Sequence, residues 1–155
     1  GNVDTRIKKL KEGLYDAIIL SKAGINSLNL NKYITQEFSV DEIIPSVGQG
    51  TIAVQCRNND HKMIEILKKI NHKETSICVS AEREILKSLE GDCETAVGAF
   101  SFIRGKTVFI KAELFSIDGK KRYYLEKSGD VKLSRDIGKY VGDFLKKNSM
   151  GNYKR

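Results

Sequence analysis

The sequence has little proline and no long apolar run, and each absence excludes a class of protein. It contains one proline in 155 residues, and its longest apolar runs are AIIL, IAV and VFI. Runs of three or four residues are far too short to cross a bilayer. Hydrophobic residues make up 40% and charged residues 30%, which is a soluble globular composition. Membrane, collagenous and disordered proteins are therefore excluded, and the length allows one ordinary domain or two small ones.

Cysteine is also scarce. Three cysteines without a CxxC pair argue against a disulfide framework and against a zinc site, and they favour a reducing cytoplasm. Cys56 and Cys78 lie at apolar positions, where a small core residue is the expected role. His61 and His72 start helices in charged surroundings, with no acidic residues at a ligand spacing. We therefore expect no metal site and a cytoplasmic location.

Positive charge exceeds negative charge, but the excess is concentrated at one end. Lys and Arg number 27 against 20 acids, a net charge of +7, and four of these cations fall in the last ten residues. The rest of the chain is thus only about +3, and it lacks a dense basic stripe with interleaved aromatics. This balance suits small acidic ligands at least as well as nucleic acid. The chain begins at Gly1 with no leader sequence, so we interpret it as a piece of a longer protein.

Residues 71–148 read as a self-sufficient α+β domain. Asn71 and Glu74 have the spacing of a capping box, and the apolar periodicity that follows predicts a helix ending at Gly91. Three segments then alternate with period two, separated by turn signals, and a closing amphipathic helix follows. The expected strands are 97–103, 106–116 and 121–127, and the closing helix is 132–147 with Leu133, Ile137, Tyr140, Val141, Phe144 and Leu145 inside. They predict a three-stranded antiparallel meander flanked by helices, with a frayed basic tail at 149–155.

The first 70 residues predict an α/β arrangement that is incomplete. A helix capped by Asp4 precedes an apolar strand at 15–20, and a marginal strand is expected at 36–40 before the break at Pro45. A glycine-rich bend then leads into a strand at 51–56, and Asp60 caps a further helix. These elements cannot cover both faces of two buried strands, so partners are missing from this part.

Three positions are candidates for chemistry. Cys93, in LEGDCETAVG, lies between a helix end and a strand, where loops present side chains to clefts, although from position alone an incidental surface thiol is the commoner case. Arg6 lies in the first turn of the opening helix, where an anion is favoured, but an exposed Arg on a solvated face is the commoner case. Gln49, between two glycines, belongs to a bend that either cradles a phosphate or marks a close backbone approach.

Five motifs in order carry a resemblance to one family. GNVDTRIKKL, YDAIILSKAGI, IPSVGQGTIAVQCR, NHKETSICVSAERE and LEGDCETAVGAF together resemble the C-terminal portion of the porphobilinogen deaminases, also called hydroxymethylbilane synthases. The resemblance implies two periplasmic-binding-protein-like lobes and a small third α+β domain. Residues 1–45 would complete the second lobe, 46–70 would return to the first lobe, and 71–148 would form the cofactor-carrying domain.

The resemblance also implies a function in haem (porphyrin) biosynthesis. Members are transferases that condense four porphobilinogen molecules into the tetrapyrrole hydroxymethylbilane, releasing ammonia at each addition. The chain grows on a dipyrromethane cofactor bound through a thioether, which the motif places on Cys93. Arg6 would bind carboxylate groups of cofactor and substrate, and Gln49 would face the growing chain. The catalytic aspartate of the family lies in an N-terminal half absent here, so this fragment alone should be inactive, and the parent enzyme should be a monomer without nucleic-acid partners.

Two other functions stay open on the residues alone. An RNA-binding α+β module would account for the net charge, but it requires a face of exposed aromatics, which the sequence does not indicate. A non-catalytic anion-binding lobe would account for Arg6 but has no use for Cys93.

Overall fold

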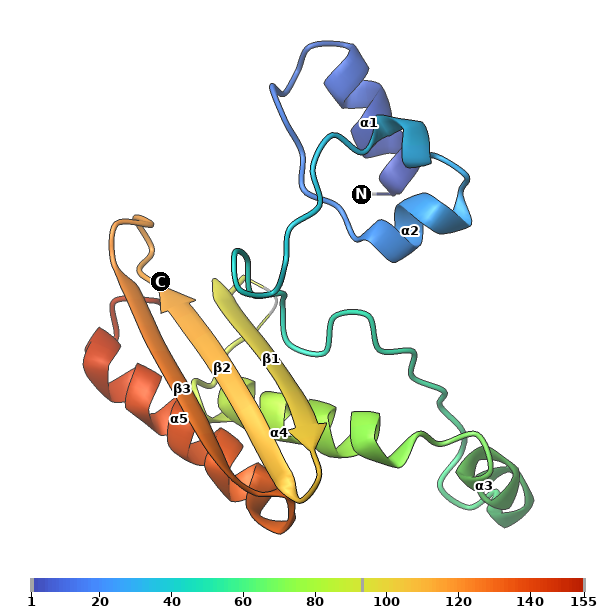
Figure 1. Cartoon of the computed structure of the whole chain (residues 1–155), viewed down its shortest axis with the longest axis vertical. Coiled ribbons are helices and arrows are strands. Elements are labelled where there is room, and N and C mark those ends of the chain that lie inside the picture. Colours follow the sequence, from blue (N-terminus) through green and yellow to red (C-terminus); the bar gives the residue numbers. More distant parts are fainter. Residues whose placement is uncertain (1, 93, 155) are drawn as a thin grey trace. The chain divides into compact units, whose positions relative to one another are not determined.

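The computed structural model describes residues 2–92 and 94–154, which form two compact units, Gly1–Ser39 and Val40–Arg155 (Figure 1). The first unit is helical, and the second contains a three-stranded sheet with its helices. Cys93 lies outside the described residues.

The first unit contains two short α-helices and a turn of 3-10 helix. These are α1 (Val3–Lys11), α2 (Lys22–Ser27) and η1 (Asn31–Tyr33). Ile7 and Ile25 are its buried apolar side chains. Asn2 occupies the position before α1. The expected cap Asp4 lies instead within the first turn, where its negative charge interacts favourably with the helix dipole.

The strands expected in the first 56 residues are absent from the described part of the chain. Segments 15–20, 36–40 and 51–56 are irregular, and Ile52 is 91% exposed. A strand exists only when a neighbour accepts and donates its backbone hydrogen bonds. The apolar pattern of these segments therefore indicates a tendency to form strands. Within the described residues, no neighbouring strand pairs with them.

The predicted meander is confirmed. Strands β1 (Val97–Arg104), β2 (Thr107–Phe115) and β3 (Arg122–Asp130) form one antiparallel sheet in the order β1-β2-β3. Arg104 pairs with Thr107, so a two-residue turn joins β1 to β2. Gly105 in that turn has φ +60°, a left-handed conformation that favours glycine.

Both long helices lie on one face of the sheet (Figure 1). They are α4 (Lys73–Ser88), which contacts β1, and α5 (Ser134–Ser149), which follows the 3-10 turn η2 (Val131–Leu133) and contacts β2 and β3. The shared core consists of Ala81, Ile85 and Leu89 from α4 and its end, Val141 and Leu145 from α5, and Ala99, Val108, Ile110, Ala112 and Leu114 from the sheet.

Glycine lets α4 and α5 approach closely. A Cβ added at Gly138 would lie 2.2 Å from the carbonyl oxygen of Ala81, and one at Gly142 would lie 2.8 Å from that of Ile85. The predicted inner face of α5 is wrong at two positions, because Leu133 and Tyr140 are more than half exposed. Leu133 precedes the helix, and Tyr140 lies outside the stripe that the glycines define.

The helix caps are confirmed in one case and corrected in the other. Asp60 accepts a hydrogen bond from the Met63 amide at 3.0 Å and begins α3 (His61–Lys68), as the sequence predicts. The cap of α4 is His72 instead of Asn71, since the His72 Nδ1 accepts from the Thr75 amide at 3.3 Å. An imidazole nitrogen thus replaces the expected amide oxygen.

The tail after α5 packs against the domain instead of fraying. Tyr153 is 6% exposed, and its hydroxyl donates a hydrogen bond to the Leu89 carbonyl oxygen at 2.9 Å. The Ile117 amide donates to the Asn152 carbonyl at 3.1 Å. A buried tyrosine is stable when its hydroxyl has a hydrogen-bond partner. Tyr153 therefore attaches the end of the described chain to the C-terminal end of α4.

Candidate functional site

The loop that follows α4 is closed by its own side chains. The Asp92 amide donates to the Thr95 Oγ at 3.0 Å, and the Asp92 Oδ1 accepts from the Glu94 amide at 2.9 Å. These bonds join residues 92, 94 and 95 in the way that acidic and hydroxyl side chains favour in turns. The hydrogen bond from the Glu94 amide is the largest effect lowering the pKa of Asp92 below its usual value. The negative charge of Asp92, next to Cys93 in the sequence, is thus partly engaged by the loop itself.

Two lysines fix the start of this loop. Glu90 has φ +50°, and its carboxylate pairs with Lys154 at 2.9 Å and with Lys146 at 3.0 Å. The hydrogen bond from Lys154, followed by that from Lys146, lowers the pKa of Glu90 to about 2. All three side chains are accessible, so salt screens these pairs. The tail and α5 together hold the residue from which the loop departs.

The glycine-rich bend consists of two consecutive turns. The Gln49 amide donates to the Ser46 carbonyl at 2.9 Å, and the Thr51 amide donates to the Gly48 carbonyl at 3.2 Å. Gly48 and Gly50 have φ of +70° and +81°. A positive φ at the third residue of a turn is the requirement that glycine meets. The bend therefore uses both glycines for backbone conformation. A Cβ added at Gly48 would approach only Val79, at 3.8 Å, and one at Gly50 would meet nothing within 4 Å, so the described residues show no close approach at either glycine.

The segment before the bend is fixed to the edge of the sheet. Ser46 forms a bridge with Gly98, and the Ala99 amide donates to the Pro45 carbonyl at 2.9 Å. A Cβ at Gly98 would lie 2.8 Å from the Ile44 carbonyl oxygen, so glycine makes this approach possible. Segments 41–46 and 95–98 line one hollow together. The start of the bend and the end of the loop around position 93 are thus neighbours.

The structure gives the two described candidates different settings. Gln49 is exposed at the tip of the bend, in the same compact unit as both flanks of the Cys93 loop. Arg6 is half-buried in the other unit, on α1. Within residues 2–92 and 94–154, its guanidinium has no hydrogen-bonded or ionic partner. That leaves the five N–H donors of Arg6 available for a carboxylate.

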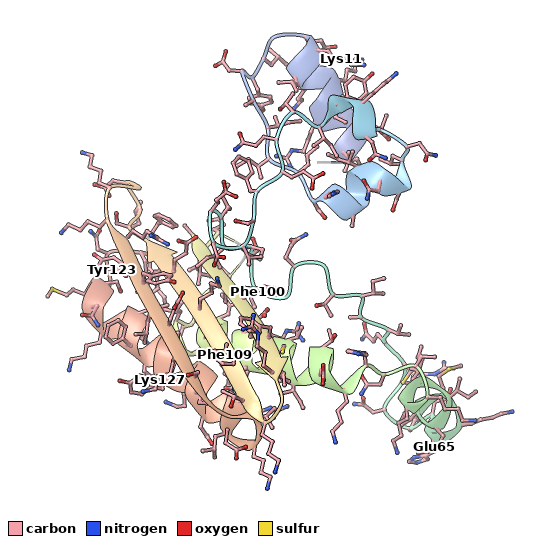
Figure 2. All side chains as sticks on the ribbon, viewed as in Figure 1. Lys11, Glu65, Phe100, Phe109, Tyr123 and Lys127 are labelled. Atoms are coloured by element: carbon pink, nitrogen blue, oxygen red, sulfur yellow. The ribbon has the colours of Figure 1, made fainter. Side chains whose placement is uncertain are left out.

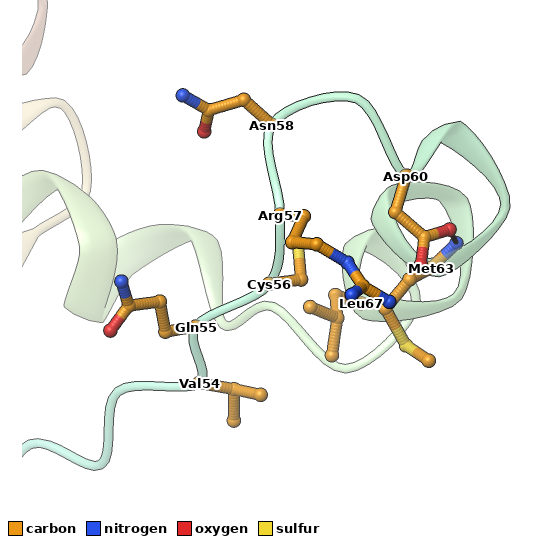
Figure 3. Close-up of a pocket in the computed structure, with 8 residues that line it drawn as sticks. All are labelled: Val54, Gln55, Cys56, Arg57, Asn58, Asp60, Met63 and Leu67. Carbon is orange, nitrogen blue, oxygen red and sulfur yellow. Dashed lines mark hydrogen bonds between the residues drawn. The ribbon is translucent and has the colours of Figure 1, made fainter.

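The other two cysteines differ in burial. Cys78 is 8% exposed, and burial is the main cause that raises the pKa of its thiol, so it is a core residue as expected. Cys56 is half-buried in an irregular segment, where it lines a hollow with Arg57 and α3 residues (Figure 3). The described residues contain no group of three or more His, Cys, Asp or Glu side chains placed to hold a metal ion. In the same residues, no helix has the length and hydropathy needed to cross a bilayer.

Two sequence profiles of one protein family match nearly all of this chain. The profile described as "Porphobilinogen deaminase, dipyromethane cofactor binding domain" matches residues 1–65. The profile described as "Porphobilinogen deaminase, C-terminal domain" matches residues 76–147. The chain belongs to the porphobilinogen deaminase family. The second profile covers the helix pair, the sheet and the loop that contains Cys93.

Curated relatives from distant organisms agree with this membership. Porphobilinogen deaminase of Coxiella burnetii strain RSA 493 is 41% identical over 145 residues, which are 94% of this chain and 47% of the relative. The enzyme of Macrococcus caseolyticus is 34% identical over 149 residues, 96% and 48% of the two chains. A probable porphobilinogen deaminase of Nitrosopumilus maritimus is 37% identical over 152 residues, 98% and 49%. The chain spans about half the length of the curated relatives it matches.

Sequence reasoning overlooked one residue beside the site. Glu82 is 6% exposed and joins the glycine bend to the sheet. A signal was present, because position 82 shares a helix face with Cys78 and Ile85, and a charged residue among apolar ones on a buried face is unusual.

Proposed function

We propose that this chain is the cofactor-carrying C-terminal portion of a transferase that condenses four porphobilinogen molecules into hydroxymethylbilane, with release of one ammonia at each addition. The whole protein would act in tetrapyrrole, and hence haem, biosynthesis. The observation that carries the proposal is the match of two profiles of one family to the chain, over residues 1–65 and 76–147. Membership of the family extends to the N-terminal unit, the bend and the loop alike.

Cys93 is the proposed attachment site of the dipyrromethane cofactor. The described flanks Asp92 and Glu94 are exposed, so the loop leaves room for a two-pyrrole group. A soft sulfur nucleophile reacts readily with an electrophilic methylene carbon, and the thioether that results resists hydrolysis. When bound, the cofactor would supply the pyrrole ring on which the chain is extended. Asp92, held by Glu94 and Thr95, would fix the loop backbone beside this sulfur.

Arg6 and Gln49 are the proposed binding residues. Arg6 would pair with the acetate and propionate groups of cofactor and substrate, a role for which a guanidinium with unused donors is suited. Gln49 would contact the elongating chain, because its carboxamide lies exposed on a bend next to the loop segment 95–98. Neither residue changes protonation in this scheme, so both would position the reactants.

The proposed division of the chain into domains follows from its family membership. Residues 1–45 would complete one periplasmic-binding-protein-like lobe, 46–70 would return to another, and 71–148 would form the third domain. The exposed apolar segments 15–20 and 51–56 support this, since strands of such lobes pair with neighbours outside this chain. The catalytic carboxylate would be supplied by an N-terminal half, in a monomeric cytoplasmic enzyme.

The test is a porphobilinogen consumption assay on two purified proteins. A full-length protein containing this chain should consume porphobilinogen and form hydroxymethylbilane, and the 155-residue chain should not. The physical reason is that the proton-handling carboxylate must be held against the same pyrrole that Arg6 positions. Turnover by the 155-residue chain alone, or none by the full-length protein, would contradict the proposal.

RNA binding by the α+β domain is a second candidate, and one observation favours it. The sheet face opposite the helices carries aromatic rings, with Phe102 stacked on Phe109 at 5.0 Å and Arg104 placed over Phe102. Figure 2 shows Phe100 and Phe109 on the sheet. Aromatic and guanidinium groups on an open sheet can stack on bases. Titration of single-stranded RNA at two salt concentrations tests it. Affinity that falls steeply with salt would support RNA binding, and no measurable affinity would eliminate it.

A further inference from the structure

A buried carboxylate lies behind the glycine bend without a cationic partner among the described residues. Glu82 on α4 is 6% exposed. Burial is the main cause that raises its pKa above the ordinary value, and three hydrogen bonds oppose this effect. A carboxylate at such a position is costly unless its oxygens accept several good hydrogen bonds. The identity of its donors therefore shows what it holds in place.

The three donors come from two segments that are distant in sequence. One oxygen, Oε1, accepts from the Ser101 amide at 2.9 Å and from the Ser101 Oγ at 2.8 Å, both on β1. The other, Oε2, accepts from the Gly48 amide at 2.9 Å. Glu82 thus joins the glycine bend, α4 and β1, and each oxygen serves one of the two joined segments.

The bond to Gly48 is placed where it controls the tip of the bend. The residues before the tip are fixed to β1 by the Ser46–Gly98 bridge and the Pro45–Ala99 hydrogen bond. The residues after it, 51–55, are exposed and irregular. Along the described chain, the hydrogen bond from the Gly48 amide to Glu82 is therefore the hydrogen bond to α4 or the sheet that lies nearest before the exposed Gln49.

We propose that Glu82 is a positioning residue, which holds the tip of the glycine bend on the α+β domain and so fixes Gln49 relative to the loop of Cys93. The inference rests on the proposed function, because it takes Gln49 as a substrate contact. The bend and the cofactor loop would then move as one body during elongation. Glu82 itself would touch neither substrate nor cofactor.

The separate duties of the two oxygens allow a sharp test. In Glu82→Gln the amide oxygen can keep both Ser101 bonds, and the amide NH2 then faces the Gly48 N–H, donor against donor. The matched control Ser101→Ala removes one bond from the same carboxylate but leaves the bond to Gly48. Replacing the buried carboxylate by a neutral amide also removes the cost of desolvating a charge, and this gain offsets the lost hydrogen bond. The global free energy of unfolding is therefore not an informative measurement.

The first readout is amide hydrogen exchange of the 155-residue chain. In the unmodified chain the Gly48 amide should be protected, and the Gly50 amide, which has no acceptor among the described residues, should exchange fast. Glu82→Gln should speed exchange at Gly48 by about tenfold or more, as expected for loss of one bond to a charged group, and Ser101→Ala should not. An unprotected Gly48 amide in the unmodified chain would overturn the proposal without any variant.

The second readout is the kinetics of the full-length protein. Glu82→Gln should raise KM for porphobilinogen by about fivefold with kcat little changed, and Ser101→Ala should leave both near the unmodified values. Equal effects of the two variants, or an unchanged KM in Glu82→Gln, would overturn the positioning role. Failure of the unmodified full-length protein to consume porphobilinogen would instead refute the proposed function. The hydrogen-exchange result at Gly48 would still test the contact with Glu82, because it does not depend on catalysis.

Discussion

A methyl group added at Gly138 should destabilise the pair of helices α4 and α5. In a helix interior, Gly to Ala normally stabilises by about 1 kcal/mol. Here the new Cβ would lie 2.2 Å from the carbonyl oxygen of Ala81, 2.9 Å from its carbonyl carbon and 3.1 Å from its Cα. All three are backbone atoms, so no side-chain rotation relieves the contact. The helices α4 and α5 must separate locally by about 1 Å to restore ordinary contact.

The expected magnitude follows from these opposing effects. Overpacking of a tight core costs about 1–3 kcal/mol, and a clash with backbone belongs at the upper end of that range. After the gain in helix propensity, Gly138→Ala should lower the free energy of unfolding by about 2 kcal/mol. For a unit of this size, the melting temperature should fall by roughly 8 °C.

Thermal unfolding followed by circular dichroism measures this effect. Gly129→Ala is the matched control, because its added Cβ meets only the side chain of Ile137, whose end atom at 2.8 Å can rotate away. That control should change the stability by less than about 1 kcal/mol. A Gly138→Ala protein as stable as the unmodified chain would refute the close approach of α4 to α5.

Three further outcomes are expected. Tyr153→Phe should lose about 1 kcal/mol with its buried hydrogen bond, whereas the control Tyr140→Phe, at a half-exposed site, should lose almost nothing in urea unfolding. Glu90 should titrate by NMR with a pKa of about 2, and Lys154→Ala should raise that pKa. Because the folded pKa is depressed, the contribution of these pairs to stability is present above the ordinary pKa of Glu and is lost as the pH falls toward 2. Cys78→Ala should cost about 1–3 kcal/mol, since Cys78 is buried in the helix face, and its unfolding curve should shift without a change in cofactor content.

Local sequence signals predicted the C-terminal domain well because they specify local events. The alternation from 97 onward, the glycine at position 105 and the apolar period of 73–88 each determine one element, and the elements pair with their sequence neighbours. The same reasoning failed at 15–20 and 51–56, where an apolar strand pattern says nothing about which partner completes the sheet. It also failed at Tyr153, since a tail with two cations gave no sign of an aromatic anchor.

The residues of the candidate site stay predictions, and the contacts that support them could not be predicted from the sequence. Motif position singled out Cys93, Arg6 and Gln49, and the family profiles cover all three regions. The tie between Glu82 and Gly48 joins residues 34 apart in sequence, and no local pattern specifies such a contact. The hydrogen bonds around Asp92 were equally hidden, because side chains that close a loop depend on its final backbone conformation.

Intact mass of the full-length protein tests the central claim most directly. If the chain carries the primer of a porphobilinogen deaminase, the unmodified protein should be heavier than its sequence by a two-pyrrole adduct. The Cys93→Ser variant should have the sequence mass alone, because serine offers no soft nucleophile for the thioether. Cys78→Ala is the control and should keep the adduct. An adduct that persists in Cys93→Ser, or an unmodified active protein without one, would contradict the account.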